Sequence, residues 1–144
     1  MPANIQPGFA LSGDVSSNNG TTMASTFTTA AADYTGATAT HNHLIFTASA
    51  NGAYVQRLRF KAAGTNVASV ARIFINNGSA NTVATNNAFY GEVSLPATTA
   101  TTTTSQADVD YFIDLVLPPS FTIYVGLATT VAGGWVCIGI GVQY

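Results

Sequence analysis

Hydrophobic and polar residues alternate along most of this chain, and glycine, asparagine and proline interrupt the alternation at short intervals. A period of two places successive side chains on opposite faces of a β-strand, whereas a helix repeats about every 3.6 residues. No segment of the sequence carries a convincing helical repeat. The sequence therefore predicts an all-β protein.

The strand pattern recurs in about eight segments at nearly regular spacing. These segments are residues 22–30, 43–49, 53–61, 67–75, 88–95, 108–117, 121–128 and 134–144. An Asn-Gly pair within residues 76–81 is typical of a turn between two strands, and the threonine-rich stretch 97–106 has nothing large to bury. This spacing indicates an antiparallel β-sandwich, and about eight strands without a cysteine pair favour a jelly roll over an immunoglobulin-like fold.

The chain of 144 residues suits one domain with a single core. Residues 1–20 carry proline, asparagine and glycine without a strand pattern, so we expect an irregular N-terminal arm there and a single sandwich domain over residues 21–144. The first residues lack the basic start and the long apolar run of a signal peptide.

Charged residues make up only 7% of the chain, against about 25% in an ordinary soluble domain. The net charge of −2 argues against a general nucleic-acid binder, because such domains are usually strongly basic. The same low charge leaves little electrostatic repulsion between copies of the chain. We therefore expect no nucleic-acid partner and a tendency to self-associate.

One uncharged run, residues 121–142, is long enough to cross a bilayer as a helix. Pro118 and Pro119 precede this run, residues 129–134 interrupt it with two glycines, and no lysine or arginine follows it. Two strands joined by a turn explain these features better than a helix does, so we expect no membrane partner.

Three of the four basic residues, Arg57, Arg59 and Lys61, stand at alternate positions of one predicted strand. They share one face, and we expect the core on the opposite face. That core face is predicted to take Gln56, Leu58 and Phe60.

A second stripe, of the opposite sign, is formed by Asp108, Asp110 and Asp114 on the predicted strand 108–117. Opposite charges across two strands contribute only about 0.2–1 kcal/mol a pair, which is too little to explain why charge is concentrated there. Three roles remain open: internal pairing on a solvated face, a contact between subunits that sets register, and a stripe that binds phosphate or nucleic acid. The concentration of charge points toward assembly.

The last predicted strand has two contrasting faces. One face, predicted to be core, carries Val136, Ile138, Ile140 and Val142. The other carries Trp135, Cys137, Gly139, Gly141 and Gln143. The two glycines predict a groove that either a loop of the same chain or a neighbouring copy fills. The lone cysteine, Cys137, is expected to be a buried small hydrophobe.

Catalytic and metal-binding patterns are weak. His41 and His43 would point the same way on a strand, and two imidazoles are an incomplete metal site unless a threefold axis gathers three copies; structural histidines are the simpler interpretation. Asp108 and Asp110 resemble a carboxylate pair, but nothing in the sequence would raise a pKa there. There is no nucleophile elbow and no glycine-rich phosphate loop. We expect a non-enzyme without a cofactor.

Segments 57–78, 89–111 and 117–144 resemble small Ala/Thr-rich proteins of tailed bacteriophages and prophages, including jelly-roll cement or decoration proteins. The resemblance implies a structural virion protein that is made in the cytoplasm of the bacterial host. It would bind the major capsid protein on the outer surface of the assembled head. No functional residue is carried over, because the resemblance includes no catalytic or ligand motif.

These observations predict a capsid decoration protein that associates with itself as a trimer or dimer. Alternatives are a tail, neck or fibre module, a carbohydrate- or receptor-binding jelly roll that uses exposed aromatics such as Tyr90 or Trp135, and a small enzyme. The candidate interface residues are Arg57, Arg59, Lys61, Asp108, Asp110, Asp114, Trp135, Gly139 and Gly141.

Overall fold

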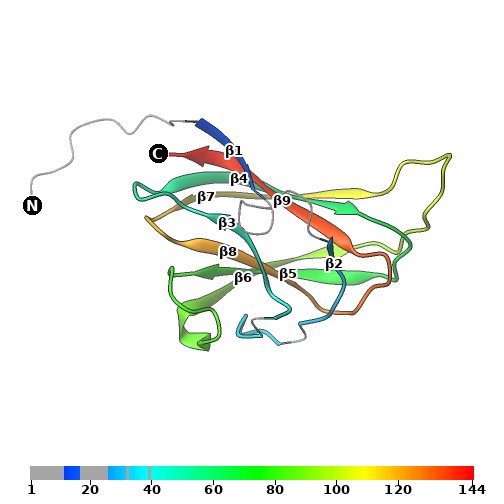
Figure 1. The fold of residues 1–144 in the computed structure, drawn as a ribbon, viewed down its shortest axis with the longest axis horizontal. Coiled ribbons are helices and arrows are strands. Elements are labelled where there is room, and N and C mark those ends of the chain that lie inside the picture. The colour runs from blue at the N-terminus through cyan, green and yellow to red at the C-terminus, as the bar shows by residue number, and fades with distance from the viewer. Residues whose placement is uncertain (1–11, 17–25, 32, 39) are drawn as a thin grey trace, which may run out of the picture.

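The computed structural model describes residues 12–16, 26–31, 33–38 and 40–144 as an all-β protein (Figure 1). The strands are β1 (Ser12–Ser16), β2 (Thr26–Phe27), β3 (His43–Thr47), β4 (Ala53–Ala62), β5 (Ser69–Asn76), β6 (Asn87–Leu95), β7 (Asp108–Leu117), β8 (Thr122–Leu127) and β9 (Trp135–Gln143). A short 3-10 helix, η1 (Ala84–Asn86), lies in the connection between β5 and β6.

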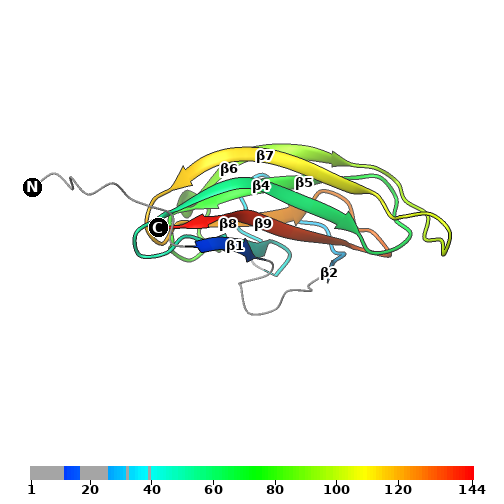
Figure 2. The same cartoon turned by 90° about the horizontal axis from the view of Figure 1, so that it is seen from above.

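The strands form two antiparallel sheets (Figure 1, Figure 2). The first sheet has the order β1-β9-β4-β7, with β2 also paired to β9, and the second has the order β3-β8-β5-β6. The predicted β-sandwich is therefore confirmed. Within it, β1 pairs with β9, β3 with β8, β4 with β7 and β5 with β6. The strand pairs are nested, and the jelly-roll connection stays a prediction.

Each predicted strand segment from residue 43 onward overlaps with one of the strands β3 to β9. In the segment 22–30 the structure describes the strand β2, and residues 22–25 of that segment lie outside the described residues. Part of the predicted irregular arm is regular: Ser12–Ser16 forms β1 and pairs with β9. Residues 1–11 and 17–20 of that arm lie outside the described residues.

The core lies between the two sheets and is almost entirely apolar. Its largest fully buried side chains are Trp135, Phe27, Phe46, Phe60, Ile45, Leu58, Ile73, Leu95, Leu117, Ile123 and Leu127. Complete burial of one such side chain stabilises a fold by about 1.5–3 kcal/mol. Cys137 is fully buried among them, as predicted, and burial raises the pKa of its thiol well above the ordinary value.

The orientation predicted for β9 is wrong. Trp135 and Cys137 point into the core with no exposed surface, while the alternate row that starts at Val136 is half-exposed on the outer face. Gly139 faces the opposite sheet, where an added Cβ would lie 3.0 Å from the ring of Phe46. The predicted groove is therefore filled by a core side chain of the same chain, Phe46.

A β-bulge in β4 explains a second wrong prediction, the burial of Gln56. The strand β9 pairs Gly141 with Val55 and then Ile140 with Arg57, which leaves Gln56 without a partner on β9. The bulge reverses the alternation, so Gln56 is exposed although Val55 and Leu58 are both buried. A Cβ on Gly141 would collide with the backbone of β4 at this place, so a glycine is needed where the bulge approaches β9.

Candidate functional site

The outer face of the second sheet is partly covered by the described residues between β2 and β3. The amide of Ala31 donates to the carbonyl of Leu127 at 2.7 Å, and the side-chain amide of Asn87 donates to the carbonyl of Thr35 at 3.0 Å. These contacts attach the connection to β8 and β6, so this face has a lid made by its own chain.

A tight turn at Asp33 holds this connection in shape. Its carboxylate accepts hydrogen bonds from the amides of Thr35 at 2.8 Å and Gly36 at 2.9 Å, and from the hydroxyls of Thr35 and Thr38. Partial burial alone would raise the pKa of Asp33, but the hydrogen bonds outweigh it and lower the pKa to about 2. The Asp33 carboxylate is thus a structural acceptor that stays charged.

The fourth basic residue, Arg72, is nearly buried between the lid and the second sheet. Its Nε donates to Oε1 of Glu92 at 3.1 Å, and its guanidinium carbon lies 3.9 Å from the centre of the Tyr34 ring. Tyr34 in turn meets Phe89 edge-to-face, with ring centres 5.3 Å apart. The alternation of β5 places Arg72 on the outer face, but no feature of the sequence predicts that a loop covers it.

The outer face of the first sheet is exposed in the described structure, and we call it the open face. Its three rows are Val136, Ile138, Ile140 and Val142 on β9; Tyr54, Arg57, Arg59 and Lys61 on β4; and Asp108, Asp110, Phe112, Asp114 and Val116 on β7. Phe112 and Val116 are 62% and 61% exposed. The open face therefore combines charged side chains with exposed apolar ones.

The predicted cation and acid stripes meet on the open face, because β4 and β7 are neighbours in the sheet. Arg59 forms an ion pair with Asp108 and lies 3.8 Å from Asp110 (Nε to Oδ1), while Nη1 of Arg57 lies 3.6 Å from Oδ2 of Asp110. The hydrogen bond from Arg59 and its positive charge lower the pKa of Asp108. Internal cross-strand pairing is thus present, and a contact between subunits stays a prediction.

Two members of the stripes are bound differently from the rest. Nζ of Lys61 donates to the carbonyl of Gln106 at 2.6 Å, and among the described residues Lys61 forms no ion pair. Asp114 accepts a hydrogen bond from the Tyr54 hydroxyl at 2.7 Å, and this bond raises the pKa of Tyr54. Exposed ion pairs contribute little to stability, so the stripes do not hold the fold together.

Three of the predicted interface residues lie inside the molecule. Trp135 is fully buried, and Gly139 and Gly141 are enclosed by Phe46 and by the β4 backbone. Their assignment to an interface is wrong because these residues face the core. Both rows of β9 are apolar, so alternation alone could not tell which row does so. Trp135 is equally unable to serve as an exposed glycan-binding aromatic, whereas Tyr90 remains 40% exposed.

The two histidines do not share a strand. His41 lies in the turn before β3, and His43 is the first residue of β3, stacked on Phe27 with ring centres 5.1 Å apart. Burial and the nearby charge of His41 lower the pKa of His43. Within the described ranges, no three His, Cys, Asp or Glu side chains gather as a metal site would require. His43 packs as a structural aromatic ring.

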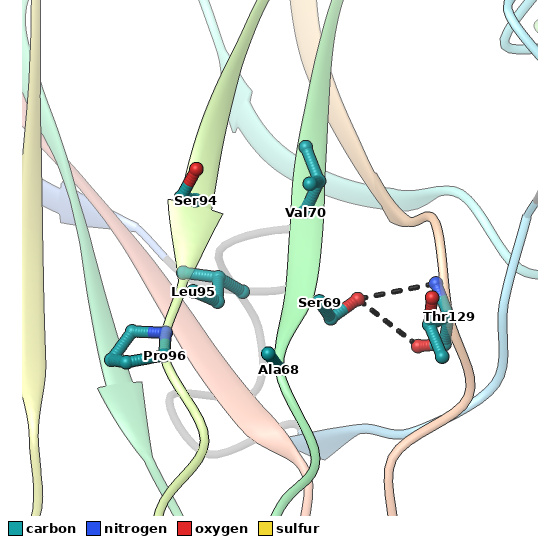
Figure 3. A pocket seen from close by; sticks show the side chains of 7 residues that line it. All are labelled: Ala68, Ser69, Val70, Ser94, Leu95, Pro96 and Thr129. Carbon is teal, nitrogen blue, oxygen red and sulfur yellow. Dashed lines mark hydrogen bonds between the residues drawn. The ribbon is translucent and has the colours of Figure 1, made fainter.

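An open depression of about 460 Å³ lies between the ends of β5 and β6 (Figure 3). It is lined by Ala68, Ser69, Val70, Ser94, Leu95, Pro96 and Thr129. The Ser69 hydroxyl is tied to the backbone of Thr129, donating to its carbonyl at 3.2 Å and accepting from its amide at 3.1 Å (Figure 3). No ionisable side chain lines this depression, so it lacks the acid or base that would activate the serine.

Comparisons with protein-family models, curated proteins and solved structures gave no match. Among the described residues, no helix has the length and apolarity that crossing a membrane requires. The open face is therefore the strongest functional candidate that the described part of the chain offers.

Proposed function

We propose that this chain is a non-enzymatic structural protein of a phage particle, a decoration protein that binds the major capsid protein on the outer surface of the assembled head. The observation that carries the proposal is the open face. Large exposed apolar side chains that lie together on a monomer are typical of surfaces that contact other proteins. The low overall charge of the chain suits close packing among many subunits.

The proposed action is stabilisation by mass action. A protein that binds the assembled shell and not its separated subunits shifts the equilibrium away from disassembly. Repeated contacts on one lattice add avidity, so each single contact can be modest. This action needs no catalytic group, in agreement with a site that consists of paired charges and apolar side chains.

The test is binding to capsids assembled without this protein, measured by co-sedimentation. We expect the wild-type chain to bind and to raise the temperature at which the shells break open. A variant with Ile138→Lys and Ile140→Lys should lose binding, because it places two charges in the apolar row of β9. The matched control, Val67→Lys with Val83→Lys, alters exposed residues away from the open face and should bind normally.

Two results would contradict the proposal. The first is a chain that ignores bare capsids under all conditions, and the second is a chain found only in purified tails. The second result would favour the tail, neck or fibre alternative, which uses the same kind of surface.

A glycan-binding function has one observation in its favour. Tyr34 and Phe89 are 57% and 44% exposed and meet edge-to-face, so they present apolar ring surface beside the polar Glu92. Sugars stack on such rings in many lectins. Binding on a glycan array that is lost in Tyr34→Ala, without loss of folding, would establish this alternative in place of the capsid proposal.

A further inference from the structure

The rows of β4 and β7 on the open face complement each other in a way that a second copy could use. Register places Lys61 opposite Asp108, Arg59 opposite Asp110, Arg57 opposite Phe112 and Tyr54 opposite Val116. A two-fold axis that runs parallel to the strands, between β4 and β7, would lay β4 of one copy over β7 of the other. Each β4 residue would then lie over the β7 residue of the other copy that corresponds to its own pairing partner on β7.

The charges favour this axis over a two-fold axis perpendicular to the strands. A two-fold axis perpendicular to the strands would lay β4 over β4 and β7 over β7, so arginines would meet arginines and aspartates would meet aspartates. Such like-charge contacts are unfavourable and help to reject wrong arrangements. Only the axis parallel to the strands brings the cation row onto the acid row in both halves of the contact.

We propose that the open face binds a second copy of this chain through β4 and β7, about a two-fold axis parallel to the strands. This contact goes beyond the proposed function and does not depend on it, because it uses the rows of β4 and β7, whereas the capsid test alters the apolar row of β9. Lys61 lies opposite Asp108 of its own chain but forms no ion pair with it in the described structure, and it gains Asp108 of the other copy.

The apolar members of the two rows also find partners in this arrangement. Phe112 would cover the guanidinium of Arg57 in the other copy, as it approaches Arg57 within its own chain at 6.0 Å. Val116 would cover the ring of Tyr54. The two apolar side chains with the greatest exposure on the open face would thus both be removed from water.

The area of the contact limits the stability of the dimer. Each of β4 and β7 has 10 residues, so two strands side by side cover roughly 300 Å² at about 3.3 Å per residue and about 4.8 Å per strand. A stable interface usually needs about 800 Å² from each partner. The dimer is therefore weak in dilute solution and becomes populated only at a high concentration of the chain.

Crosslinking reports on so weak a contact. Two stacked sheets lie about 10 Å apart, so the Cα atoms of residue 112 in the two copies would be about 11 Å apart, within reach of a short bis-maleimide. The native thiol, Cys137, is buried, so a crosslink reports on an introduced cysteine. We expect Phe112→Cys at high concentration to give several-fold more dimer than Val83→Cys, an exposed control away from the open face. Added salt should reduce the yield.

Charge reversal tests the orientation. In the Phe112→Cys background, Arg57→Glu with Arg59→Glu makes the face acidic, and Asp108→Lys with Asp110→Lys makes it basic. Neither variant should crosslink alone, and their mixture should crosslink well. The matched control converts the exposed threonines 101–104 to four glutamates in one chain and four lysines in the other. In the Phe112→Cys background, the two control chains should each crosslink like the parent, with no requirement for mixing.

A milder variant covers the case in which the reversals do not fold, as judged by circular dichroism. Lys61→Glu breaks no ion pair within the chain and should still reduce crosslinking at residue 112 several-fold; Asp108→Lys in the mixing partner should restore it. Equal crosslinking at residues 112 and 83, or full crosslinking of the acidic or Lys61→Glu variant alone, would overturn the two-fold contact. Capsid binding is measured separately, so its failure and the failure of this contact are distinguishable.

Discussion

Replacing the two glycines of β9 by alanine tests whether they lie in the core or at an interface. In Gly139→Ala, the new Cβ would lie 3.0 Å from Cδ2 of Phe46 and 3.5 Å from Cγ2 of Ile45. Overpacking costs about 1–3 kcal/mol, and the loss of glycine's freedom in the unfolded chain offsets about 0.4–1 kcal/mol. We expect a net loss of about 1 kcal/mol, because the Phe46 ring can shift.

Gly141→Ala should cost more, since its Cβ would meet the carbonyl oxygen of Tyr54 and lie 2.9 Å from Cα of Val55. These atoms belong to the backbone of β4 and can move only if the strands separate at the bulge. We expect a loss of about 3 kcal/mol, at the upper end of overpacking effects. At roughly 4 °C per kcal/mol for a domain of this size, the melting temperature would fall by about 12 °C.

Urea unfolding followed by tryptophan fluorescence measures both changes, because Trp135 is buried in the same strand. A second substitution provides the control: Phe46→Leu makes room beside residue 139 and not beside residue 141. In a double-mutant cycle it should relieve Gly139→Ala and leave the cost of Gly141→Ala unchanged. If both alanine variants unfold at the wild-type urea concentration, the glycines are not enclosed as described and the orientation of β9 is wrong.

Three further predictions concern ionisable groups. Because hydrogen bonds hold the pKa of Asp33 at about 2, its contribution to stability is present above its ordinary pKa of 3.8 and is lost as the pH falls through about 2; acid unfolding of Asp33→Asn should therefore lack this component. The pKa of His43 is lowered, so the unfolded state takes up the proton first as the pH falls below about 6.5. His43→Phe should remove this decline in stability, measured by melting between pH 7 and pH 5. Cys137 should react with a maleimide only after denaturant is added, because the thiol is buried and its pKa is raised.

The strands β7 and β9 show when alternation in the sequence can predict which face of a strand is buried and when it cannot. On β7 the acids alternate with apolar residues, so each face has its own chemistry, and the exposure of Asp108 and Asp110 and the burial of Ile113 follow from alternation alone. On β9 both faces are apolar. The choice between them depended on how much room the opposite sheet leaves, which is set by Phe46 and is not encoded locally.

The sequence itself carries a signal of the bulge at Gln56. Apolar residues occupy positions 53 and 55 and then 58, 60 and 62, so the alternation changes phase between Val55 and Leu58. A change of phase inside one strand is what a bulge produces. By contrast, the burial of Arg72 under the lid depends on where residues far along the chain come to lie. The residues next to Arg72 on β5 therefore do not predict that its side chain is buried.

The nested pairing of strands has a consequence for the order in which the chain folds. The pair β5 and β6 is joined by a short connection and can form early, whereas Ser12 must find Gln143 across nearly the whole length of the chain. Contacts between distant residues slow folding, because the entropy of a long loop is lost before the contacts form. The first sheet also cannot be completed until β9 leaves the ribosome, since β1, β2 and β4 all pair with it. A nascent chain that stalls before residue 135 would therefore expose one edge of β4, and chaperones or premature aggregation would act on that edge during synthesis.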